Sequence, residues 1–235
     1  MTEFEQFKEN LFERRRQREL QEFGRELTPP ERDAIYSGYS VEDEAAMLKK
    51  RDQEWINKKL NLFPKRYTGK TFENFNCEKS IHKAAIEHLK TGASAIVCGS
   101  VGCGKTHLAY AAVRYQVEKF IDAEYILAFD MFNQIKRTFS DDTGKETDRT
   151  MNWLSNIPYL VIDELDKTYR KDTEYVYLNK LINARYNNCL PTVLITNANE
   201  EELVDLLGAS VKSRVAGTGG IINMPEGDYR PKESE

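Results

Sequence analysis

Long hydrophobic runs are missing from this sequence of 235 residues. No apolar stretch approaches the roughly 18 residues that a membrane-spanning helix needs, so we expect no membrane partner. The first ten residues place Phe4 and Phe7 among charged and polar side chains, which is unlike the apolar core of a signal peptide. We therefore expect a cytoplasmic protein.

Cysteine is scarce, and the positions of the four cysteines argue against the usual cysteine-based sites. Cys77, Cys98, Cys103 and Cys189 include no Cys-x-x-Cys pair and have no accompanying histidine pair, so a zinc site is not expected. In a reducing compartment such residues most often serve as small buried side chains. We expect that structural role here.

An excess of positive charge is also absent. The net charge of −4 makes the overall field mildly repulsive to phosphate groups, so nucleic-acid binding would need a local basic patch. Two candidates are Lys136-Arg137 and the stretch Lys167–Lys171, which adds a tyrosine to three basic residues. Such a mixture suits single-stranded DNA, but a solvated helix start explains it equally well.

Residues 1–62 differ in character from the rest of the chain. They are rich in charges of both signs, and the apolar residues from Phe4 onward recur at helical spacing as a thin apolar face. Helix starts are predicted at Thr28–Glu31 and Ser40–Asp43. So narrow a face suits docking onto a partner, although an arm packed on the chain's own second domain has the same pattern. We expect a small helical region over 1–62 and a separate domain over 63–235.

The second region alternates short apolar segments with helical patterns. Unbroken apolar strands that alternate with helices indicate an α/β fold, in which a parallel sheet is covered on both faces. Strands are predicted at 94–98, 124–128, 159–162 and 192–195, and helices at 105–119, 131–138, 175–186 and 200–207.

A glycine-rich loop follows the first predicted strand. Its residues match the pattern G-x-x-x-x-G-K-[ST], in which a tight turn directs backbone N–H groups toward anionic oxygens. The helix that follows directs its positive end to the same place. We expect Lys105 to reach the β- and γ-phosphates of ATP and the Thr106 hydroxyl to ligate Mg²⁺. The loop residues are Gly99, Ser100, Val101, Gly102, Cys103, Gly104, Lys105 and Thr106.

Two adjacent carboxylates end the third predicted strand. Asp163 and Glu164 directly follow the apolar residues Tyr159–Ile162. We expect Asp163 to hold the magnesium through a water, because Mg²⁺ keeps most of its hydration shell. Glu164 is suited to orient or deprotonate the attacking water. An apolar strand before Asp-Glu is common by itself, and the upstream phosphate loop is what favours this interpretation.

Two more polar residues are candidates for the same site. Asn197 follows the fourth predicted strand, where ligands bind in open α/β sheets, so it could orient the lytic water or sense the γ-phosphate. The alternative is that Asn197 only begins a turn. Arg214, in the pair Ser213-Arg214, is of the type that one subunit provides to stabilise charge on a transferred phosphoryl group. Taken alone, such an arginine is more often part of a surface ion pair.

The order of these motifs resembles that of AAA+ ATPases. More narrowly, the chain resembles the DnaC/DnaI-type replicative helicase loaders and the related IstB-type transposition ATPases, over roughly residues 63–230. The narrower resemblance rests on Arg66-Tyr67, Phe72–Phe75, Gly99–Ala109, Val161–Glu164 and Asp228–Arg230.

This resemblance implies a parallel sheet flanked by helices and an ATP-dependent factor that loads a hexameric replicative helicase onto single-stranded DNA. His107 would join the phosphate loop at the nucleotide, and Arg66–Phe75 would line the adenine pocket. The ATPase domains would self-associate, with Arg214 completing the neighbour's site and Arg230 acting as a second nucleotide sensor. By position alone, residues 1–62 would bind the helicase. The stretch from Arg214 to Arg230 is too short for the helical lid of many AAA+ proteins, so we expect a short or absent lid.

Two other functions fit parts of the pattern. An IstB-type ATPase would assist DNA transposition on duplex DNA, and a metabolic P-loop kinase would phosphorylate a small acceptor. The Asp163-Glu164 pair and Arg214 argue against the kinase. Preference for single-stranded or duplex DNA, together with a helicase or transposase partner, separates the first two functions.

Overall fold

The computed structural model describes residues 16, 19, 24–31, 41–75, 80–140, 144–168 and 172–228. The chain divides into two units, Met1–Leu62 and Phe63–Glu235. The apolar stripe predicted from Phe4 onward, the residues Tyr169–Lys171 and the candidate Arg230 lie outside the described residues. Among the described helices, none combines the length and apolar character that crossing a membrane requires.

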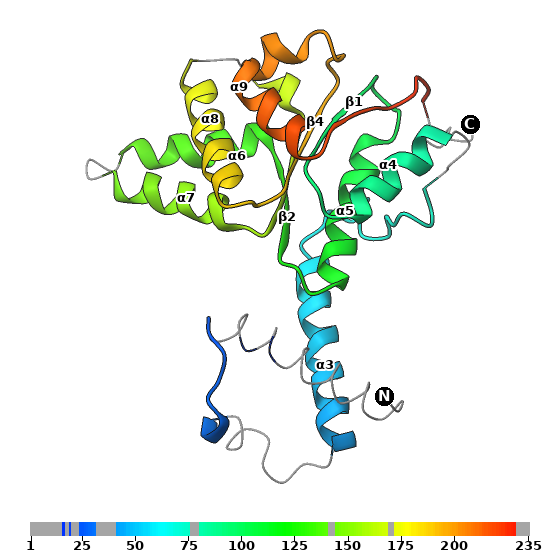
Figure 1. Cartoon of the computed structure of the whole chain (residues 1–235), viewed down its shortest axis with the longest axis vertical. Helices are drawn as coiled ribbons and strands as arrows, with labels where there is room; N and C mark the ends of the chain where they lie inside the picture. Colours follow the sequence, from blue (N-terminus) through cyan, green and yellow to red (C-terminus); the bar gives the residue numbers. More distant parts are fainter. Residues whose placement is uncertain are drawn as a thin grey trace. The chain divides into compact units, whose positions relative to one another are not determined.

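The first unit contains α3 (Val41–Leu60), a 20-residue helix (Figure 1). It begins within the predicted start Ser40–Asp43. The other predicted start is also helical, since residues 29–31 lie in a helix. There the Glu31 carboxylate accepts hydrogen bonds from the backbone N–H and the hydroxyl of Thr28, each of 2.8 Å. A glutamate that reaches back to the residue before its helix is typical of a capped N-terminus.

The second unit is built on a five-stranded parallel sheet, which confirms the predicted fold class. Its strands run in the order β2-β3-β4-β1-β5, and each neighbouring pair is parallel. Every residue of β1, β3 and β4 is buried, as expected of strands covered on both faces. The bounds are Ala95–Cys98 for β1, Ala123–Leu127 for β2, Tyr159–Asp163 for β3, Thr192–Thr196 for β4 and Ile221–Asn223 for β5.

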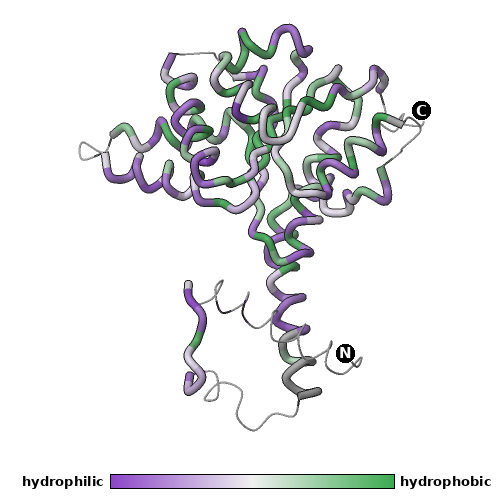
Figure 2. The backbone as a smooth tube through the Cα atoms, viewed as in Figure 1, coloured by the Kyte–Doolittle hydropathy of each residue, from purple (hydrophilic) through white to green (hydrophobic). Residues whose placement is uncertain are grey.

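Helices lie on both sides of this sheet (Figure 1). One side carries α4 and α5, and the other carries α6, α7, α8 and α9. The hydrophobic residues concentrate on the central strands in Figure 2. The bounds of the helices are Ser80–Lys90 for α4, Lys105–Glu118 for α5, Ala128–Arg137 for α6, Lys145–Asn156 for α7, Asp172–Asn187 for α8 and Leu203–Thr218 for α9. Short 3₁₀ turns lie at Thr138–Ser140 (η1) and Leu165–Lys167 (η2).

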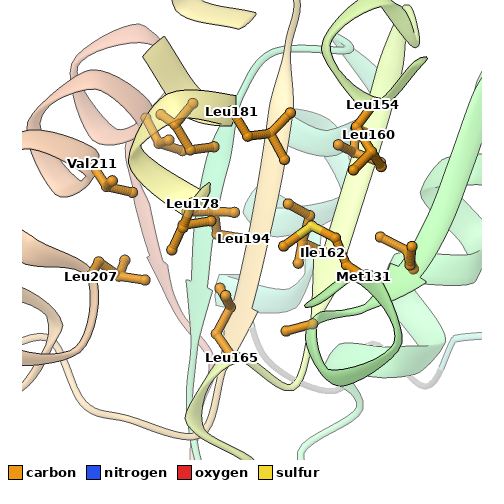
Figure 3. Close-up of a cluster of buried hydrophobic side chains, with 14 of the residues drawn as sticks. Met131, Leu154, Leu160, Ile162, Leu165, Leu178, Leu181, Leu194, Leu207 and Val211 are labelled. Atoms are coloured by element: carbon orange, nitrogen blue, oxygen red, sulfur yellow. The ribbon is translucent and has the colours of Figure 1, made fainter. Parts of the chain in front are cut away.

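The main hydrophobic cluster lies between the sheet and helices α6–α9 (Figure 3). Leu160, Ile162 and Leu194 face it from the central strands, and each has no exposed surface. Leu178 and Leu181 meet them from α8. This packing fixes the strand ends, and with them the loops that follow the strands.

A buried arginine lies at the end of the sheet where β3 and β4 begin. Arg185 of α8 has no exposed surface, and its guanidinium donates hydrogen bonds to the carbonyl oxygens of Leu154, Ile157 and Pro191 at 2.7–2.8 Å. It also donates to the Thr192 hydroxyl at 2.8 Å. Burial lowers the pKa of Arg185 to about 10, so the side chain is still charged at neutral pH. One side chain thus joins the end of α7 to the start of β4.

Several elements differ from the sequence prediction. The four predicted strands are present within one or two residues, but β5, α4 and α7 were not predicted. The helix predicted at 200–207 is the first part of α9, which is interrupted at Gly208, and Arg214 follows this break within the second helical part of α9. Between α9 and residue 228 the described chain contains only β5 as regular structure, in agreement with the short or absent lid. The polar sequence of α7 and the three-residue length of β5 give too little periodicity to predict either one.

Gly208 interrupts α9, and its conformation leads to a prediction about stability. Its φ of 78° and ψ of 151° belong to a region that is nearly restricted to glycine, and a Cβ there would collide with the Tyr175 hydroxyl. We expect Gly208→Ala to lower the free energy of unfolding by about 1–3 kcal/mol. Gly217→Ala, at an ordinary helical position with open space around it, is the matched control and should stabilise by about 0.5–1 kcal/mol. Urea unfolding measures both changes, and equal effects of the two substitutions would contradict this account.

Candidate nucleotide-binding site

The glycine-rich loop connects the end of β1 to the first turn of α5, as predicted. Gly104 is the residue before the helix and has a φ of 94°, which favours glycine. A Cβ at this position would lie 2.6 Å from the Phe75 ring, so the loop and the segment before α4 can approach this closely only through glycine. At the start of α5 the free backbone N–H groups and the helix dipole favour an anion.

Lys105 lies over this loop. It is buried, with 7% of its surface exposed, and its ammonium donates hydrogen bonds to the carbonyl oxygens of Gly99 (2.7 Å) and Ser100 (2.8 Å). The Cys103 sulfur lies 3.6 Å from the same nitrogen. Carbonyl groups are neutral acceptors, so the lysine charge remains available to a phosphate group at the loop.

Asp163 and Thr106, the two residues predicted to hold magnesium, form a hydroxyl–carboxylate pair. The Thr106 hydroxyl donates to Asp163 Oδ2 at 3.0 Å, and the backbone N–H of Glu164 donates to Oδ1 at 2.7 Å. The Tyr125 hydroxyl also donates to Oδ2, at 3.0 Å. Burial raises the pKa of Asp163 although these three hydrogen bonds oppose the shift. A carboxylate held in this way, only 2% exposed, is suited to a divalent cation, whose charge would offset the burial.

Glu164 lies at the cavity wall directly after β3. Its backbone is left-handed, with φ 59° and ψ 40°, which turns the chain sharply into η2. Its carboxylate accepts a hydrogen bond of 2.5 Å from the Lys167 ammonium. This bond raises the pKa of Lys167. Glu164, a predicted site residue, lines the cavity with the other candidates, and its lysine partner was not foreseen from the sequence.

Asn197 is held by Asp166, a residue that the sequence analysis did not assign to the site. The backbone N–H and the side-chain amide of Asn197 each donate to the Asp166 carboxylate at 2.8 Å. The Thr196 hydroxyl donates to the same carboxylate at 3.1 Å. Burial alone would raise the pKa of Asp166, but these hydrogen bonds outweigh it and lower the pKa. The amide of Asn197 is therefore fixed in orientation at the end of β4.

The lowered pKa of Asp166 predicts a pH-dependent contribution to stability. Because the folded-state pKa lies below the ordinary value of 3.8, the contribution is present above about pH 4 and is lost as the pH falls through the folded-state pKa. Wild-type protein should therefore be more stable than Asp166→Asn at pH 7, and the difference should shrink below about pH 4. Unfolding by urea over this pH range measures it. Asp148→Asn, at a carboxylate that is 71% exposed, should show a much smaller change, and a pH-independent difference for Asp166→Asn would refute the assignment.

These residues surround a cavity of about 500 Å³, a size typical of small-molecule sites. The segment Arg66–Phe75 forms one wall, where the resemblance placed the adenine pocket. His107 joins this wall to α5, since its ring lies 2.9 Å from the Thr71 carbonyl oxygen and meets the Phe75 ring edge-on. Burial lowers the pKa of His107. The lining residues are Arg66, Tyr67, Lys70, Asn74, Phe75, Val101, Gly102, Gly104, Lys105, Thr106, His107, Asp163, Glu164, Asp166, Lys167, Thr196 and Asn197.

The donors at this cavity fit a magnesium nucleotide. No cluster of three or more His, Cys, Asp or Glu side chains able to hold a metal occurs among the residues that the structure describes. The hydroxyl–carboxylate pair of Thr106 and Asp163 matches instead the oxygen donors that Mg²⁺ prefers when phosphates complete its coordination.

Arg214 is not part of this cavity. It lines a second cavity, of about 620 Å³, together with Tyr186, Gly92 and Leu190. Its guanidinium donates to the Ser210 carbonyl and hydroxyl and lies 5.8 Å from the centre of the Tyr186 ring. The structure thus separates Arg214 from the nucleotide cavity of its own chain.

Comparisons with known proteins agree with this site. The family described as IstB-like ATP binding protein matches residues 38–212. Two proteins named replicative helicase loader DnaC are similar in sequence: that of Escherichia coli (strain K12) is 34% identical over 153 residues, 62% of each chain, and that of Buchnera aphidicola subsp. Baizongia pistaciae is 29% identical over 157 residues, 63% of this chain and 64% of the relative. The matched region covers less than two thirds of the length of either relative.

Solved structures show the same fold. A crystal structure of the DnaC helicase loader superposes with a TM-score of 0.61 at 23% identity, covering 69% of this chain and all of the other. The resemblance to AAA+ proteins of the DnaC and IstB type, inferred from the motifs, is therefore confirmed.

Proposed function

The chain belongs to the IstB-like ATP-binding proteins, and from that premise we propose that it is an ATP-dependent DNA replication factor that binds a hexameric replicative helicase and loads it onto single-stranded DNA. The observation that carries the nucleotide part is the cavity in which Lys105, Thr106 and Asp163 meet. The similarity to proteins named replicative helicase loader supports the helicase part.

In this proposal the candidate residues at the cavity have different roles in ATP hydrolysis. Lys105 leaves the loop carbonyls and contacts the β- and γ-phosphates, while Thr106 and Asp163 hold the magnesium, which neutralises phosphate charge. Glu164 and Asn197 orient the attacking water, and Asp166 fixes the amide of Asn197. Such positioning and electrostatic stabilisation account for most of the catalysis of phosphoryl transfer.

The remaining surfaces of the chain have partner roles in the proposal. Residues 1–62 bind the helicase, and their charged sequence, with apolar residues at helical spacing, suits a docking element. The ATPase units self-associate so that Arg214 of one subunit faces the nucleotide of the next. ATP hydrolysis then acts as the switch between the bound and released helicase.

An IstB-type role on duplex DNA is the second candidate. It is favoured by the family match, which extends from residue 38 into the ATPase unit. The two candidates share the nucleotide site and differ in the type of DNA and in the protein partner.

Two experiments on the full chain test the proposal. The first measures ATP hydrolysis with single-stranded DNA, with duplex DNA and without DNA. The second measures capture of a purified hexameric replicative helicase. Stimulation by single strands and ATP-dependent helicase capture are the expected results. Stimulation by duplex DNA without helicase capture would move the assignment to the IstB-type role. Phosphorylation of a small acceptor without any effect of DNA would overturn both.

A further inference from the structure

Three stacked tyrosines lead from the first residues of the ATPase unit to the Asp163 carboxylate. The Tyr67 and Tyr110 rings stack with centroids 4.4 Å apart and planes 10° apart. The Tyr110 and Tyr125 rings stack at 4.2 Å and 26°. The Tyr125 hydroxyl then donates to Asp163 Oδ2 at 3.0 Å. Aromatic contacts of this kind hold rings in defined relative positions.

One face of α5 carries the middle ring of this stack of three tyrosines, which we call the tyrosine column. Thr106, Tyr110 and Arg114 are spaced four residues apart, so they lie on the same side of the helix. Thr106 donates to Asp163, and Tyr110 lies between the two other tyrosine rings. Arg114 donates to the carbonyl oxygens of Thr68 and Lys70. The face therefore joins the segment Phe63–Lys70 to the carboxylate that ends β3.

Phe63 adds a further contact at the beginning of that segment. Its ring meets the Tyr110 ring edge-on, with centroids 4.9 Å apart. Phe63 is the first residue of the second unit, directly after residues 1–62 in the sequence. A displacement of the segment would thus be transmitted to the Tyr110 ring through two aromatic contacts.

Asp163 receives hydrogen bonds from two side chains, and they differ in role. Thr106 is itself a proposed magnesium ligand, whereas Tyr125 has no proposed contact with the nucleotide or the metal. Tyr125 lies on β2, the strand beside β3, where Leu127 and not Tyr125 is the register partner of Asp163. Its ring packs against the Tyr110 ring, and its hydroxyl reaches the carboxylate from the neighbouring strand. Hydrogen bonds to a ligating carboxylate orient it, and their loss commonly weakens metal binding 10–100-fold.

We propose that Tyr125 is a positioning residue for Asp163, and that its stack with Tyr110 and Tyr67 makes the magnesium site depend on the segment Phe63–Lys70. This inference rests on the proposed nucleotide function. It assigns the tyrosine column to magnesium binding, so nucleotide binding that needs no magnesium should be independent of Tyr125.

The test is binding of a fluorescent ATP analogue to the full chain, titrated with MgCl₂ and repeated in EDTA. Tyr125→Phe keeps the ring and removes the hydroxyl, so we expect about a 10-fold higher magnesium concentration at half-maximal effect. Affinity in EDTA should be unchanged. The control is Tyr177→Phe, which removes the hydroxyl of a tyrosine of α8 whose ring packs on Phe139.

A second variant tests the stack itself. Tyr110→Leu removes the middle ring and should raise the magnesium requirement in the same direction. Combined with Tyr125→Phe, it should add less than its separate effect, because both changes disable the same column.

The outcomes separate the two proposals. An unchanged magnesium midpoint in Tyr125→Phe, with normal nucleotide binding by the wild-type chain, would overturn the positioning role and leave the proposed function intact. Fully additive effects of the two substitutions would overturn the role of the stack. Failure of the wild-type chain to bind nucleotide with or without magnesium would refute the proposed function and the positioning role together.

Discussion

Replacing Lys105 by alanine is expected to remove most ATP binding. The ammonium group lies within 2.8 Å of two carbonyl oxygens of the phosphate loop, so it is held beside the loop and can turn from these neutral acceptors to the phosphates of ATP. Charge-assisted hydrogen bonds contribute about 1.5–3 kcal/mol each, and loss of two of them predicts a decrease in affinity of about 100-fold or more. Equilibrium binding of a fluorescent ATP analogue measures the loss.

Lys180→Ala is the matched control for this substitution. Lys180 lies on α8, its side chain is 58% exposed, and its ammonium is 3.9 Å from the Asp148 carboxylate. Its removal changes the net charge by the same amount and should leave ATP affinity within twofold. Equal affinities of the Lys105→Ala and Lys180→Ala proteins would reject the assignment of the loop as a phosphate site.

Arg214→Ala is expected to leave ATP binding intact and to lower hydrolysis in the assembled state by about 10³-fold. The side chain lines a cavity other than the nucleotide cavity and contacts Ser210 and Tyr186. It can therefore act on a phosphoryl group only in another copy of the chain. Hydrolysis at protein concentrations above and below assembly, with affinity measured in parallel, separates the two effects.

Mixing two inactive variants gives a sharper test of the same residue. In an assembly of Lys105→Ala and Arg214→Ala subunits, some interfaces combine an intact phosphate loop with an intact Arg214 from the neighbour. Hydrolysis should then recover to a fraction of the wild-type rate. If the mixture stays as inactive as its components, or if Arg214→Ala alone hydrolyses ATP normally, the role in trans is wrong. Arg214→Lys should recover little, because a lysine lacks the planar guanidinium group.

Sequence reasoning could predict that the motifs made of consecutive residues lie close together in the fold. The loop from Gly99 to Thr106 and the Asp163-Glu164 pair each follow an apolar strand, and parallel strands bring their carboxyl ends to one edge of the sheet. Five of the eight loop residues, both carboxylates and Asn197 line the cavity. Their proximity therefore follows from the order of strands and helices.

The residues that hold these groups could not be predicted in the same way. Tyr125 meets Asp163 because β2 pairs with β3 in a particular register, and the Tyr125 ring also packs against Tyr110. Asp166 reaches Asn197 because Glu164 adopts a left-handed conformation and turns the chain toward β4. Both contacts depend on strand register and local backbone geometry, which composition and spacing do not reveal. A carboxylate three residues after Asp163 was the one available signal for Asp166.

The buried guanidinium of Arg185 has a consequence for how this fold can vary. It provides the donors for three main-chain carbonyl groups: that of Leu154 in the last turn of α7, that of Ile157 in the connection after α7 and that of Pro191 in the connection before β4. A chain without arginine at this position would have to satisfy those carbonyls with other groups, because an unpaired buried carbonyl costs about 1–3 kcal/mol. The identity of residue 185 and the lengths of both connections should therefore change together among related sequences. A redesign that shortens either connection would have to replace the arginine in the same step.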